Sequence, residues 1–235
     1  MGRIAPIAAL ALLTCCRGPV APLPVDPAMA SYVPPGAVVL AGIDLAGLRA
    51  SPLYAKLPPA ILGLTQPFQN APSMLLASNG KDLLLVAGGK LTGPPDFVQA
   101  AEAQHRSGVT GVPDLLNHAQ SIAAGQHIWL VVRGGTVLPL TGNAANVNRL
   151  LRDMEFAALT LRADSAIDVA LTARGRTPEA ARHFENTLRA TLTMAAAGET
   201  RLAPTLRSIQ LQREDRTVQA KVSLTPDAAQ RLLTW

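Results

Sequence analysis

The order of strand and helix patterns along the chain is the feature that most limits its fold. From Ala37 onward, short aliphatic runs alternate with stretches in which aliphatic residues recur every three or four positions. Read in this way, both halves of the chain follow the order strand, helix, two strands, helix, strand. That order predicts an α+β protein.

Two arrangements fit this order. One is a pair of ferredoxin-like modules in tandem, each with the split βαβ topology, covering residues 36–135 and 136–235. The other is one larger antiparallel sheet with helices on one face. Both arrangements include a return strand at 136–140, directly after the Gly134-Gly135 turn.

Several local signals support individual elements. Asn79-Gly80 between two aliphatic runs predicts a hairpin, because a tight type I′ turn needs positive φ at both central residues. Thr177-Pro178-Glu179 predicts a helix start, and Gly198 is a natural end for the same helix. Trp129 lies within a predicted strand, so we expect it in the core.

Composition excludes several classes of function. The chain is 49% hydrophobic but only 3% aromatic, so its core must consist mainly of Ala, Leu and Val. Charged residues make up 16%, and the net charge of +5 is spread along the chain without a basic run. With so few aromatic rings there is no stacking platform for bases. We therefore expect no nucleic-acid partner.

The N-terminus has the features of an export signal. Arg3 precedes an apolar stretch from Ile4 to Thr14, which fits the apolar region of about 7 to 15 residues in a signal peptide. A membrane-spanning helix would need about 20 apolar residues. We expect residues 1–16 to direct export and residues 17–35, which are rich in proline, to form an extended tether.

The sequence Leu12-Leu13-Thr14-Cys15-Cys16-Arg17 resembles the lipobox of bacterial lipoproteins. In that family a cysteine preceded by small residues, with a leucine three positions upstream, is lipidated and becomes the new N-terminus. The resemblance implies lipid attachment at Cys16, with Cys15 as the alternative, although neither choice matches the motif fully. An ordinary signal peptide cleaved elsewhere, such as after Ala30, is the competing interpretation.

A second resemblance covers about 25 residues at the start of the folded part. Residues 32–40, followed by Asp44-Leu45 and Ser51-Pro52-Leu53-Tyr54, look like the start of uncharacterised exported bacterial proteins, many of them lipoproteins. This resemblance implies location in the cell envelope, on the periplasmic side or at the outer membrane. It transfers no functional residue.

The chain carries no recognisable nucleotide, metal or hydrolase motif, and we predict no cofactor and no metal site. The one loop with a catalytic type of composition is 104–114, which contains His105, Ser107 and Asp114. Nucleophilic catalysis would require Ser107 to be hydrogen-bonded to His105, with Asp114 behind it. The plain alternative is a connection between two helices.

The leading hypothesis from the sequence is a non-enzymatic lipoprotein of the bacterial envelope. It would be held to the membrane by its N-terminal lipid and would bind another envelope protein or a small apolar ligand. The alternative is an envelope hydrolase that uses the loop containing His105, Ser107 and Asp114. Convergence of those three side chains would favour the enzyme, and their separation would favour a binding module.

The choice of lipidated cysteine is directly testable. We expect Cys16→Ala to abolish incorporation of labelled fatty acid into the protein expressed in a bacterium that processes lipoproteins. Cys15→Ala is the matched control and should still be labelled. Labelling of the Cys16→Ala protein would contradict the assignment.

Overall fold

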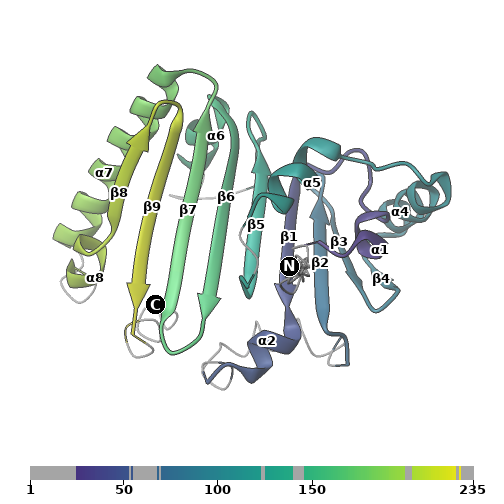
Figure 1. Ribbon diagram of the computed structural model, residues 1–235. Helices are drawn as coiled ribbons and strands as arrows, with labels where there is room; N and C mark the ends of the chain where they lie inside the picture. Colours follow the sequence, from purple (N-terminus) through teal and green to yellow (C-terminus); the bar gives the residue numbers. More distant parts are fainter. Residues whose placement is uncertain are drawn as a thin grey trace, which may run out of the picture.

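The computed structural model describes residues 25–52, 54, 68, 70–122, 125–139, 146–198, 203–225 and 228. One antiparallel sheet of nine strands forms the centre of the molecule, in the order β4-β3-β2-β1-β5-β6-β7-β9-β8 (Figure 1). The strands are β1 (Val39–Asp44), β2 (Ser73–Ser78), β3 (Leu83–Ala87), β4 (Lys90–Thr92), β5 (Ile128–Arg133), β6 (Met154–Ala163), β7 (Ile167–Gly175), β8 (Gln210–Glu214) and β9 (Thr217–Leu224). The helices are α1 (Pro27–Ala30), α2 (Leu45–Ala50), α4 (Pro95–Ser107), α5 (Pro113–Gln120), α6 (Asn146–Arg152), α7 (Pro178–Gly198) and α8 (Ala203–Arg207).

The prediction of an α+β protein is confirmed, and of the two arrangements the sheet follows the single antiparallel one. In a split βαβ unit, another strand would lie between β1 and the strand that follows α2. Here β1 pairs directly and antiparallel with β2. The sheet also continues without interruption from β5 to β6, with six paired positions from Ile128↔Leu161 to Arg133↔Phe156. The first and second halves of the chain therefore share one sheet.

The helices do not all lie on one face, which corrects that part of the prediction. We call the two sides the α5 face and the α7 face. Helices α4 and α5 pack on the α5 face over the N-terminal strands, through a core that includes Leu40, Leu75, Phe97 and Leu115. Helices α6 and α7 pack on the α7 face over the C-terminal strands, through Leu151, Phe184 and their neighbours (Figure 1). These four helices therefore change side in the middle of the sheet, whereas the short helix α2 packs on the α7 face through Leu45 and Leu48.

Trp129 fills the core of the N-terminal part, as predicted. Its side chain is 3% exposed, and Gly42 is its cross-strand partner on β1. A Cβ atom at Gly42 would lie 2.2 Å from the indole ring. The ring therefore occupies the space that any side chain at position 42 would need.

The packed part of the chain begins earlier than the predicted end of the tether at residue 35. Val25 and Val33 are 2% and 0% exposed, and both belong to the core beneath α4 and α5. Between them Asp26 caps α1 by accepting a hydrogen bond from the Ala28 N–H at 2.9 Å. Met29, Ala30 and Tyr32 pack against the same core, so this part of the proline-rich segment is docked on the fold and is not a free tether.

The local signals have mixed outcomes. The hairpin at Asn79-Gly80 is confirmed, but its loop has four residues, and the Asn79 side chain accepts hydrogen bonds from two following N–H groups. Helix α7 ends at Gly198 as predicted, and Thr177 caps its start through a bond from the Ala180 N–H. The strand predicted at 136–140 is wrong within the described residues 136–139, which are not part of the sheet.

We expect Gly42→Ala to lower the free energy of unfolding by about 1–3 kcal/mol, because the new methyl group must displace the Trp129 ring in a filled core. Gly36→Ala is the matched control, since no atom lies within 4 Å of a Cβ at that position. Urea unfolding of the purified protein measures both. Equal stability of the two variants would contradict the packing described here.

Candidate functional site

The three residues of the predicted catalytic loop have separate partners. The Nδ1 atom of His105 lies 2.7 Å from the Ser31 hydroxyl, and its ring stacks on Tyr32 with centroids 4.1 Å apart. The Ser107 hydroxyl donates to the Gln104 carbonyl at 2.6 Å. Asp114 accepts two hydrogen bonds from Arg133, both at 2.9 Å.

No hydrogen bond joins His105, Ser107 and Asp114 to one another in the described part of the chain. The proton of the Ser107 hydroxyl is directed at a main-chain oxygen of its own helix, not at an imidazole. The Ser31 hydroxyl donates to the Ala28 carbonyl, so toward His105 it acts as acceptor from Nδ1–H. His105 therefore links α4 to the C-terminal end of α1. The loop lacks the hydrogen bonds among serine, histidine and aspartate that nucleophilic catalysis needs.

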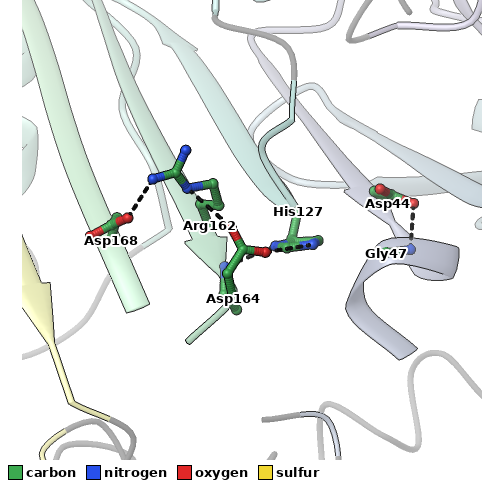
Figure 2. Close-up of polar contacts among 7 residues, drawn as sticks. Asp44, Gly47, His127, Arg162, Asp164 and Asp168 are labelled. Carbon is green, nitrogen blue, oxygen red and sulfur yellow. Dashed lines mark hydrogen bonds and ion pairs between the residues drawn. The ribbon is translucent and has the colours of Figure 1, made fainter. Parts of the chain in front are cut away.

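A second polar cluster lies where β5, β6 and β7 meet (Figure 2). His127 is 9% exposed, and its Nδ1 accepts a hydrogen bond from the Ala163 N–H at 2.8 Å. Its Nε2 atom lies 4.0 Å from Asp164. Because Nδ1 accepts, the proton of the neutral ring is on Nε2, on the side of Asp164. The guanidinium group of Arg162 forms two ion pairs. Its Nε lies 3.4 Å from a carboxylate oxygen of Asp164, and its Nη2 lies 2.8 Å from one of Asp168.

This cluster borders a polar groove on the α5 face, which no described helix covers beyond β6. The groove has a volume of about 410 Å³ and is lined mainly by side chains of the C-terminal strands, including Thr160, Arg162, Asp168, Gln210, Lys221 and Ser223. Hydrogen bonds from Arg162 and Ser223 lower the pKa of Asp168, so its carboxylate is charged at neutral pH. The single positive charge of Arg162 is paired with two aspartates, Asp164 and Asp168, and Lys221 adds a second positive charge to the lining of the groove.

The α7 face carries an accessible apolar surface, which we call the aliphatic band. It consists of two rows of side chains that run across the strands, because directly paired residues share a face of the sheet. The first row is Leu85, Leu76, Ala41, Leu130, Leu159, Leu171, Ala220 and Leu211. The second row is Ile43, Ile128, Leu161, Val169 and Val222.

The band lies between two covered regions of the same face. Helices α6 and α7 bury the next row along the strands, which includes Val132, Ala157 and Ala173. At the other end, Leu45 and Leu48 of α2 pack on the sheet. Every member of the two rows remains partly accessible, and Leu159 at the centre is 38% exposed. The helices cover the rows in part, since Leu48 packs against the second row and the core beneath α6 and α7 packs against members of the first row. The apolar surface that stays accessible, centred on Leu159, is a candidate binding surface.

The remaining predictions of site residues have different outcomes. Cys15 and Cys16 lie outside the described residues, so lipid attachment stays a prediction. Within the described ranges, His, Cys, Asp and Glu side chains form no group of three that could hold a metal ion. None of the described helices has the length and apolar character required to cross a membrane.

Comparison with known proteins gives few matches. No protein-family model and no curated protein sequence matches the chain. Among solved structures it is similar to TP0453, a Treponema protein, with 10% sequence identity. Crystal form III of TP0453 aligns over 89% of this chain and 98% of its own with a TM-score of 0.45, and form I over 89% and 97% with a TM-score of 0.43.

The pairing of Asp114 with Arg133 predicts a pH-dependent stability. Burial acts to raise the pKa of Asp114, but the hydrogen bonds and positive charge of Arg133 outweigh it and lower the pKa overall. A carboxylate with a lowered pKa stabilises the fold above its unfolded pKa of about 3.9, and this contribution is lost as the pH falls through the folded value.

We expect Asp114→Asn to lower the free energy of unfolding by about 0.5–1 kcal/mol at pH 7, because the pair is partly exposed. The difference from the unmodified protein should shrink as the pH falls below about 4. Urea unfolding at several pH values measures it. Glu102→Gln, whose nearest guanidinium is 4.0 Å away, is the control and should have the smaller effect. A deficit of Asp114→Asn that is independent of pH would contradict the assignment.

Proposed function

We propose that this protein is a non-enzymatic binding module of the bacterial envelope, exported and anchored by a lipid on Cys16. The observation that carries the proposal is the aliphatic band. Contiguous accessible apolar surface is costly in water, and on folded proteins it commonly marks a site of contact with a ligand, a partner or a membrane. The export and anchoring parts of the proposal rest on the N-terminal sequence.

The surroundings of the band support a small apolar ligand over a protein partner. The band is bounded along the strands by α6 and α7 on one side and by α2 on the other. A flat protein surface could not reach it without contacting these helices first. Within the paired strands that form the floor, the backbone N–H and C=O groups are used by the sheet, and the side chains have no polar atoms. The floor therefore offers only apolar contact.

The hydrolase alternative has less support. Its three residues are hydrogen-bonded to other groups, and Ser107 lacks a base within hydrogen-bond reach among the described residues. A reaction at this loop would require His105 to leave both Ser31 and the Tyr32 ring. No comparable rearrangement is needed for binding at the band.

Binding at the band can be tested with N-phenyl-1-naphthylamine, a neutral apolar dye whose fluorescence rises in apolar surroundings. The protein is a chain starting at residue 17, which retains every described residue. We expect saturable binding that Leu159→Gln weakens about threefold to tenfold, because one accessible aliphatic contact is replaced by a polar one.

The matched control is Val109→Gln, which changes an exposed apolar residue in the loop between α4 and α5. It should bind the dye as the unmodified protein does. Equal binding by Leu159→Gln and the unmodified chain would contradict the proposed site. Hydrolysis of p-nitrophenyl butyrate that is lost in Ser107→Ala would overturn the non-enzymatic assignment in favour of the hydrolase.

A further inference from the structure

A cavity with two arginines lies at the β8 end of the aliphatic band. It has a volume of about 310 Å³ and lies between the C-terminal half of α7, α8 and β8. Its apolar lining is formed by Leu192, Ala196, Ala197, Leu206, Ile209 and Leu211. Leu211 is also the last member of the first row of the band, so the two surfaces are continuous.

Arg189 and Arg207 line the same cavity and give it a positive charge. Of the two, Arg189 donates a hydrogen bond to Glu185 at 2.9 Å, and Glu185 also accepts one from Arg213 at 2.9 Å. One negative charge is therefore shared by two guanidinium groups. The side chain of Arg207 has no ion pair or hydrogen bond to any of the described residues. The two arginines that line the cavity carry a charge of +2, of which Glu185, outside the lining, offsets a part through its bond to Arg189.

We propose that the cavity and the band together bind a long-chain fatty acid. The carboxylate lies at Arg207 and Arg189, and the alkyl chain extends past Leu211 along the band. This proposal rests on the binding function proposed above and names the class of ligand. A guanidinium bonds a carboxylate through two parallel N–H groups, and these charge-assisted bonds are stronger than neutral ones. Arg207 has its donors available for such a pair.

The shape of the band suits a single alkyl chain. The first row crosses eight strands, which at a spacing of about 4.8 Å gives a row of aliphatic side chains roughly 34 Å long. The second row lies beside it, so a chain between the rows would contact methyl groups on both sides. Neither row contains an aromatic ring, and neither contains a polar side chain. A peptide or a sugar placed here would leave its own polar groups without hydrogen-bond partners.

The test is isothermal titration calorimetry of the chain starting at residue 17 with dodecanoate, octanoate and dodecan-1-ol, each below its aggregation concentration. Dodecanoate should bind at least tenfold more tightly than octanoate, because each buried CH₂ group strengthens binding by up to about fourfold. Dodecan-1-ol has the same chain without the charge, so it should bind more weakly than dodecanoate.

Two variants separate the parts of the site. Arg207→Gln should weaken dodecanoate about threefold to tenfold and leave dodecan-1-ol unchanged. Leu159→Gln should weaken both. Arg106→Gln, on the exposed surface of α4, is the matched control and should change neither. Circular dichroism of each variant verifies that the fold is retained.

The outcomes distinguish this proposal from the one on which it rests. Equal effects of Arg207→Gln on dodecanoate and dodecan-1-ol would overturn the carboxylate site and leave the apolar binding function standing. Binding of N-phenyl-1-naphthylamine that depends on Leu159, with no binding of dodecanoate, would overturn the fatty-acid proposal alone. If the unmodified protein bound neither the dye nor dodecanoate, both the fatty-acid proposal and the proposed binding function would be overturned.

Discussion

The pairing of β5 with β6 is the constraint on which the rest of the molecule depends. It joins strands from the two halves of the chain in one sheet, with Leu130 opposite Leu159 and Val131 opposite Ala158. Side chains alternate between faces with a period of two, so a shift of one residue would transfer every aliphatic side chain of β6 to the other face. The register at this one junction therefore decides which surfaces of the C-terminal half are apolar.

The two surfaces that remain open follow from where the helices lie. Helices α4 and α5 cover the α5 face only over the N-terminal strands, and α6 and α7 cover the α7 face only over part of the C-terminal strands. The open part of the α5 face carries polar groups such as Thr160 and Lys221. The open part of the α7 face carries the aliphatic band. The polar groups on the open part of the α5 face can be hydrated, whereas the apolar band on the α7 face suits an apolar ligand.

The three candidate catalytic residues of the loop at 104–114 are close in sequence, but their side chains are bonded to different parts of the molecule. Its histidine is bonded to Ser31, 74 positions away in sequence, and its aspartate to Arg133 on a strand of the sheet. The Ser107 hydroxyl bonds to the helix that contains it. The arginines of the cavity at α7 could not be paired from the sequence, because Arg189 and Arg207 belong to different helices and come together only through the packing of α7, α8 and β8.

By itself the sequence determined the local elements and the α+β class. Asn79-Gly80 set a hairpin, Thr177 and Gly198 set the ends of α7, and Trp129 was recognisable as core. The apolar residues of strands such as β5 do not say which face a helix will cover. Three features were decided only by the tertiary structure: the face of the sheet that each helix covers, the alignment of the aliphatic rows, and the docking of Val25 and Val33. The physical reason is that register and helix placement are contacts between distant segments, whereas turns and caps are contacts between neighbours.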